Sequence, residues 1–193
     1  MKSDKTMITA IAIYAAVMTM VLSILSAHAQ ETDPVKKANK VNDKKADNNL
    51  VDEDVADFLV KSADARMMDA QEGKLATEKG TAAPIREYGK LMMKDQDALL
   101  RKIKQLAAKR NIMLPSGISD KKEDGREDLA EEKGEDFDDK FIKMMIIDHE
   151  RDVKLFEKAT EFKDSEVSAF AKANLPIIQS HLDKIKAIKH QLQ

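Results

Sequence analysis

The chain has 193 residues, a formal net charge of −2 at pH 7, and no cysteine. The lack of cysteine excludes disulfide bonds, thiol catalysis and lipid attachment through a cysteine. The near balance of acidic and basic residues argues against nucleic-acid binding, because binding phosphates through counterion release requires a concentrated basic patch.

The first segment, residues 1–29, is predicted to be a signal peptide. Two lysines precede an apolar stretch over residues 7–25, which is followed by the small residues Ala27 and Ala29. This order is typical of a cleavable secretory signal, so we expect a periplasmic or secreted protein. The apolar stretch is also close to the roughly 20 residues that span a bilayer. The alternative is therefore an uncleaved membrane anchor with the rest of the chain outside the cytoplasm, and membrane contact is expected only in that case.

The segment that follows is rich in Asp, Asn and Lys and has few large apolar residues, so we predict a disordered linker over residues 30–49. Residues 50–193 are predicted to form one helical domain. Apolar residues recur there at three- and four-residue spacing in four stretches, which is typical of amphipathic helices. The predicted helices cover residues 51–79, 83–111, 136–161 and 164–193.

The connections predict how these helices are joined. Short turns link the first helix to the second and the third to the fourth, so each pair is expected to be an antiparallel hairpin. Residues 112–135 are long enough to run back along the bundle, at about 3.3 Å per extended residue, with a short helical piece near Leu129. We therefore predict an all-α fold: a ferritin-like four-helix bundle with a long crossover between helices 2 and 3, which run parallel.

Several short motifs carry a family resemblance. They are Glu72-Gly73-Lys74-Leu75-Ala76, Met92-Met93-Lys94-Asp95, Phe137-Asp138, Asp148-His149 with Val153-Lys154-Leu155-Phe156-Glu157, and Leu175-Pro176 followed by His181-Leu182. In this order, over residues 58–192, they resemble the exported bacterial ferritin-like proteins grouped as domain-of-unknown-function family 4142. The resemblance implies that the chain has a ferritin-like fold and is exported, with a link to stress tolerance. The chain differs from the family pattern at Gln96, where the family usually has histidine, and at Asp69, where it usually has glutamate.

A metal site is the most specific chemical hypothesis that the sequence offers. His149, His181, Asp69 and Asp152 all fall on predicted inward-facing stripes, with Asp148 or Glu72 as alternative oxygen ligands. Two imidazoles with carboxylates suit zinc, iron or manganese, and helical bundles build metal sites from facing helices. Methionine pairs in three of the helices would add thioether ligands for copper, although such residues usually fill gaps in the core. Against a di-iron site, no Glu-x-x-His pair occurs and Gln96 replaces a histidine.

The competing interpretation is a buried hydrogen-bonded network. His149 and Asp152 are three residues apart on one helix, where such a contact is natural, and buried polar groups are normally hydrogen-bonded. His190 is expected on the surface. No nucleophile elbow, zinc-protease motif or phosphate-binding glycine loop occurs, so enzymatic activity is the less favoured interpretation. We expect an exported, non-enzymatic ferritin-like bundle protein of the cell envelope. The alternative is a metal-binding protein with redox or storage activity and a transition-metal cofactor.

Overall fold

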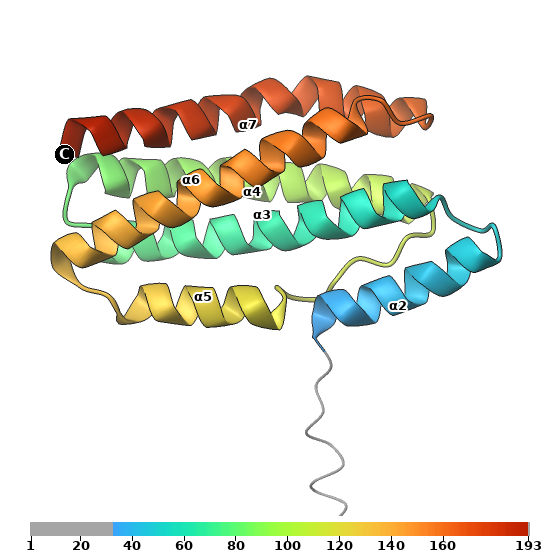
Figure 1. Cartoon of the computed structure of the whole chain (residues 1–193), viewed down its shortest axis with the longest axis horizontal. Coiled ribbons are helices and arrows are strands. Elements are labelled where there is room, and N and C mark those ends of the chain that lie inside the picture. Colours follow the sequence, from blue (N-terminus) through green and yellow to red (C-terminus); the bar gives the residue numbers. More distant parts are fainter. Residues whose placement is uncertain (1–32, 193) are drawn as a thin grey trace, which may run out of the picture. The chain divides into compact units, whose positions relative to one another are not determined.

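The computed structural model describes residues 33–192, and all regular structure in this range is helical (Figure 1). The helices are α2 (Pro34–Asp47), α3 (Glu53–Lys79), α4 (Ala83–Lys109), α5 (Asp120–Glu131), α6 (Gly134–Ala159) and α7 (Ser165–Leu192). The prediction of an all-α fold is confirmed. The four predicted helices correspond to α3, α4, α6 and α7, with each end within two residues of its predicted place. Within residues 33–192, no helix is both long enough and apolar enough to cross a membrane. The predicted signal peptide lies outside the described residues.

The prediction of a disordered linker over residues 30–49 is wrong for the part that forms α2. The carboxylate of Asp33 caps this helix by accepting hydrogen bonds from two backbone amides of its first turn, at 2.8 and 3.0 Å. Asn42 exchanges two hydrogen bonds of 2.8 Å with the backbone of Met113, in the segment between α4 and α5. Polar caps and side-chain-to-backbone contacts therefore hold α2 in place, together with the fully buried Ala38.

The four long helices form two hairpins. α3 pairs with α4 and α6 pairs with α7, while further contacts join α3 to α6 and α4 to α7. Figure 1 shows α4 and α6 running in the same direction, as predicted, with α5 inside the crossover that connects them. α5 contacts both α3 and α6. α3 therefore has neighbours on most sides, and more of its residues are buried than in any other described helix.

The interior consists of two apolar clusters with polar residues between them. The first cluster includes Phe58, Ile103 and Phe156, and the rings of Phe58 and Phe156 meet edge to face at 5.1 Å. The second includes Tyr88 and Phe141. Along α3, α4, α6 and α7, buried polar side chains occupy the positions between these two clusters. The two apolar clusters therefore enclose a polar layer.

A carboxylate of α6 fixes the start of α4. The backbone amides of Thr81 and Ala82 donate hydrogen bonds to Asp138, at 3.0 and 2.9 Å, and the hydroxyl of Thr81 donates a third. Ala82 is the N-cap residue of α4 and has no side chain that could cap it. Because this carboxylate belongs to another helix, its hydrogen bonds also fix the position of α6 along the α3–α4 hairpin.

Two glycines allow the backbones of α3 and α4 to touch. A Cβ atom added to Gly73 would lie 2.7 Å from the carbonyl oxygen of Gly89, and one added to Gly89 would lie 2.5 Å from that of Gly73. Both distances are too short for non-bonded atoms, and the obstructing atom in each case belongs to the backbone. Only glycine permits this approach, which brings the polar residues of α3 close to α4.

We predict that Gly73→Ala and Gly89→Ala each destabilise the fold by about 1–3 kcal/mol, because the two helices must separate to make room for a methyl group. Gly125→Ala in α5 is the matched control. A Cβ there would meet only the terminal methyl of Met144, at 3.8 Å. The control should be neutral, or more stable by up to about 1 kcal/mol through helix propensity. Chemical denaturation gives all three values, and equal stability of Gly73→Ala and Gly125→Ala would contradict the close approach.

Candidate functional site

Seven polar side chains meet in the layer between the apolar clusters, and we call them the polar centre. They are Arg66, Asp69 and Glu72 from α3, Gln96 from α4, His149 and Asp152 from α6, and His181 from α7. None is more than 4% exposed. Burying this many polar groups is costly unless they satisfy one another, so their contacts decide what the centre can do.

The main interaction of the polar centre is a buried ion-pair triad. A terminal nitrogen of Arg66, Nη2, lies 3.1 Å from Oδ2 of Asp69 and also pairs with Oδ2 of Asp152. Arg66 and Asp69 belong to α3, whereas Asp152 belongs to α6. The guanidinium therefore joins two helices that are not consecutive in the chain. A fully buried arginine needs such partners, because an unpaired buried charge is strongly destabilising.

Each histidine has one ring nitrogen engaged and one unengaged. Nδ1 of His149 lies 2.9 Å from the carbonyl oxygen of Met145, and because a carbonyl only accepts, Nδ1 carries the proton. Nε2 of His181 lies 3.1 Å from a carboxylate oxygen of Asp95. The two rings meet edge to face with their centroids 5.7 Å apart. Nε2 of His149 and Nδ1 of His181 have no hydrogen-bond partner among residues 33–192.

Burial determines the charge state of the centre. It lowers the pKa of His149 to about 4. The pKa of His181 is also lowered by burial, although its hydrogen bond with Asp95 opposes the shift. Burial, together with the nearby charges of Asp69 and Asp148, raises the pKa of Glu72 well above its ordinary value. The histidines and Glu72 therefore favour their neutral forms, and Arg66 with its two aspartates carries the charge.

The four candidate ligands predicted from the sequence all lie in the polar centre, in two groups. His149 and His181 contact each other, while Asp69 and Asp152 share Arg66. Gln96 reaches the centre from α4, where its amide donates to the sulfur of Met92 at 3.6 Å. In the part of the chain that the structure describes, no three His, Asp or Glu side chains are arranged to hold a metal ion. The ligand assignment stays a prediction.

Sequence reasoning missed Arg66. A charged residue in a helix is usually assigned to the solvated face, and this chain has many such residues. The signal was nonetheless present, because Arg66 lies three residues before Asp69, which was predicted to face inward. Helical periodicity therefore also places Arg66 on that inward-facing stripe.

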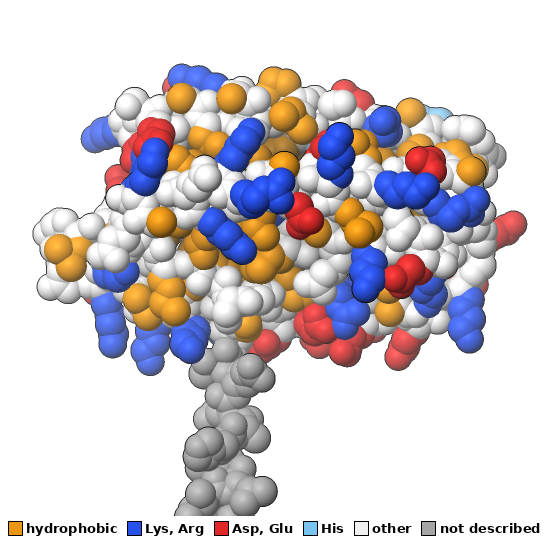
Figure 2. Space-filling model, turned by 180° about the vertical axis from the view of Figure 1, so that it is seen from behind, with side chains coloured by type: hydrophobic (Ala, Val, Ile, Leu, Met, Phe, Trp, Pro, Cys, Tyr) orange, Lys and Arg blue, Asp and Glu red, His pale blue; other side chains and the backbone are white. Residues whose placement is uncertain are grey.

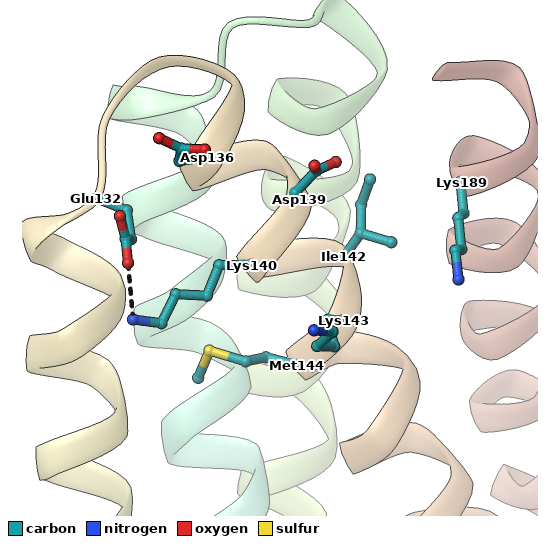
Figure 3. A pocket seen from close by; sticks show the side chains of 8 residues that line it. All are labelled: Glu132, Asp136, Asp139, Lys140, Ile142, Lys143, Met144 and Lys189. Atoms are coloured by element: carbon teal, nitrogen blue, oxygen red, sulfur yellow. Dashed lines mark hydrogen bonds and ion pairs between the residues drawn. The ribbon is translucent and has the colours of Figure 1, made fainter. Parts of the chain in front are cut away.

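A separate surface groove lies beside the junction of α5 and α6 (Figure 3). It encloses about 670 Å³ and is lined mainly by charged side chains, among them Asp136, Asp139 and Lys143. Nζ of Lys140 and Oε1 of Glu132 pair across it at 3.0 Å. None of the residues that line this groove is a buried polar group without a partner. The polar centre is therefore the better candidate for a functional site.

Comparison with known proteins assigns the family. The family model described as Domain of unknown function (DUF4142) matches residues 40–188. The chain belongs to this family. The matched region of this DUF4142 protein contains every residue of the polar centre.

The chain is also similar to a solved structure, the crystal structure of a DUF305 fragment from Deinococcus radiodurans. The two share 12% sequence identity and a TM-score of 0.65, and the match covers 73% of this chain and 98% of that one. At that identity the likeness concerns the fold alone. No curated protein matches the chain.

We predict that acidification destabilises this DUF4142 protein through His149. The pKa of His149 is about 4 in the folded state and 6.5 when the imidazole is fully solvated, so the unfolded chain binds more protons between these values. The contribution of His149 to stability is therefore fully present above pH 6.5 and falls as the pH drops toward 4, by about 2 kcal/mol between pH 7.5 and 5. Glu72, whose pKa is raised, contributes with the opposite sign, so the loss due to His149 is the difference between the wild type and His149→Gln. Urea denaturation at a series of pH values measures this loss.

His149→Gln should lose less stability over the same pH interval, because glutamine does not titrate. His181 keeps its own contribution of the same sign. The matched control is His190→Gln, since His190 is exposed and should leave the pH profile of the wild type unchanged. An identical acid-induced loss in His149→Gln and the wild type would show that His149 is not held neutral by burial.

Proposed function

We propose that this DUF4142 protein is an exported, non-enzymatic ferritin-like bundle of the cell envelope, in which the polar centre holds four helices in one relative position. A link to stress tolerance follows from the family resemblance. The observation that carries the proposal is the ion-pair triad, in which Arg66 of α3 engages Asp152 of α6. Such a triad specifies how two helices are placed along each other, as buried polar groups do in other helical assemblies.

The arrangement of the helices supports a ferritin-like bundle. Two antiparallel hairpins are joined by a crossover that includes α5, and α4 and α6 run in the same direction (Figure 1). This combination distinguishes ferritin-like bundles from bundles in which every helix is antiparallel to the next.

The burial of the polar centre supports a structural role. Its members are at most 4% exposed, so a substrate cannot reach them without the helices moving apart. Both aspartates are engaged by Arg66, and the histidines favour their uncharged forms. Glu72, whose pKa is raised by burial, favours its protonated form, so the ion-pair triad is the main charged interaction of the centre.

A metal-binding protein with redox or storage activity is the second candidate, and the histidines favour it. Met145 and Asp95 each engage one nitrogen of a histidine ring, and the other nitrogen of each ring stays unengaged. Metal-bound histidines commonly show this pattern, because the partner fixes the ring and the tautomer. Iron, manganese, zinc or copper would bind such nitrogens. Against this candidate, Arg66 occupies both predicted carboxylate ligands and places a positive charge beside any cation.

Native mass spectrometry of the protein recovered from the bacterial envelope tests both parts of the proposal. We expect a chain that begins at Gln30, found in the soluble periplasmic or secreted fraction, with no stoichiometric metal. A membrane-bound chain that keeps residues 1–29 would contradict export by cleavage. A stoichiometric metal that stays bound through purification would favour the second candidate.

A binding experiment provides the control for metal lost during purification. Zinc, manganese, ferrous iron or cuprous copper is added to metal-free protein, and thermal unfolding is followed. A ligand at 100 times its dissociation constant would stabilise the folded state by about 2.7 kcal/mol. We expect no stabilisation. Stabilisation that disappears in both His149→Ala and His181→Ala but persists in His190→Ala would establish the metal site instead.

A further inference from the structure

The charges of the protein are divided unevenly between its helices. α4 and α7 together carry eleven Lys or Arg against five Asp or Glu, whereas α3, α5 and α6 carry twelve against twenty-one. The short helix α2 is also basic, with five Lys against two Asp. The net charge of −2 for the whole chain therefore conceals a basic pair of neighbouring long helices, α4 and α7, beside the acidic helices α3, α5 and α6. We call the exposed side of this pair the α4–α7 face.

Most of the cations on the α4–α7 face are free to meet a partner. Six are exposed and form no ion pair within residues 33–192. They are Lys94, Arg101, Lys102, Lys104, Lys172 and Lys184. By contrast, Lys90 pairs with Glu87, and Lys109 pairs with Glu166. These six cations therefore leave unpaired positive charge on the solvent side of α4 and α7, as Lys37, Lys40 and Lys44 do on α2.

The same two helices expose large apolar side chains. Met93 on α4 is 36% exposed, and Ile177 and Leu192 on α7 are 43% and 42% exposed. Figure 2, which views the molecule from the side opposite to Figure 1, shows apolar side chains lying between lysine and arginine side chains. A surface that combines cations with single apolar side chains suits the boundary of a bilayer, where headgroup phosphates and acyl chains meet.

Salt in solution screens the negative charge of the acidic helices from a partner that contacts the α4–α7 face. Packed helices lie about 8–10 Å apart, and the Debye length at physiological ionic strength is about 8 Å. A negatively charged surface in contact with α4 and α7 is therefore exposed mainly to their positive charge. The acidic helices α3, α5 and α6 repel a negatively charged surface that approaches from their side. The protein is therefore expected to meet such a surface in one orientation, with α4 and α7 toward it.

We propose that the α4–α7 face binds the surface of a membrane that contains anionic phospholipids. The unpaired lysines and arginine contact headgroup phosphates, and Ile177 and Leu192 enter the interface between headgroups and acyl chains. This contact needs neither the polar centre nor the N-terminal apolar stretch. It is a second way for the bundle to associate with the envelope, beyond the structural role proposed above.

Vesicle co-sedimentation of the full chain tests the proposal. One set of vesicles contains equal amounts of phosphatidylglycerol and phosphatidylcholine, and the other contains phosphatidylcholine alone. We expect binding to the anionic vesicles at least about tenfold tighter than to the neutral ones, weakening as salt is added. An uncleaved N-terminal anchor would instead bind both sets alike and would be insensitive to salt.

Two matched triple variants locate the binding face. Lys94→Gln, Arg101→Gln and Lys184→Gln together should weaken binding to the anionic vesicles about 100-fold, at about fivefold for each charge near the surface. Lys37→Gln, Lys40→Gln and Lys44→Gln change the net charge equally but lie on α2, and they should leave binding within about threefold of the wild type. All six side chains are exposed, so circular dichroism should show both variants folded.

Four results would overturn the proposal. They are equal binding to both sets of vesicles, an equal loss in both triple variants, tighter binding to a DNA duplex than to vesicles at the same salt concentration, and sedimentation without vesicles that the α4–α7 variant abolishes. The last result would identify a second copy of the chain as the partner, because its acidic helices offer the complementary charge.

Discussion

The guanidinium of Arg66, buried between Asp69 and Asp152, is the interaction on which the rest of the interior depends. A buried charge is tolerated only where partners surround it, so α3 and α6 must keep the relative position that brings the two aspartates to the same nitrogen. The neighbouring histidines then favour their neutral forms, because burial and the positive charge of Arg66 both lower the pKa of His149. The two apolar clusters close the polar layer from either side.

Backbone contacts set the frame in which this triad forms. Gly73 and Gly89 let α3 and α4 approach until their backbones touch. Asp138 ties α6 to the turn of that hairpin by accepting hydrogen bonds from the backbone amides of Thr81 and Ala82. At the other end, Arg110 at the end of α4 forms two hydrogen bonds with Asp164 before α7, at 2.6 and 2.7 Å. Each hairpin is thus attached to the other at its ends, and the triad fixes the middle.

Much of this architecture could be predicted from the sequence, because the helices of the bundle are long and amphipathic. Apolar periodicity located α3, α4, α6 and α7, and the same periodicity placed His149, His181, Asp69 and Asp152 in the interior. It could not identify α2, whose place depends on Asp33 and Asn42 contacting distant backbone atoms. Periodicity also could not show that Arg66 forms ion pairs with both aspartates, because pairing between helices depends on their relative position in space. Spacing alone therefore placed Asp69 and Asp152 in the interior without identifying the cation that they share.

A double-mutant cycle between Arg66 and Asp152 tests most directly whether the triad fixes the bundle. Arg66→Met alone leaves buried carboxylates without a counter-charge, so we expect a loss of about 3–5 kcal/mol in the free energy of unfolding. Adding Asp152→Leu should recover at least about 2 kcal/mol of that loss, because it removes one of the unpaired charges. The same cycle on the exposed pair of Lys61 and Asp57 provides the reference, with an expected coupling below about 1 kcal/mol. Additive effects at Arg66 and Asp152, or a loss no larger than at the surface pair, would contradict the account.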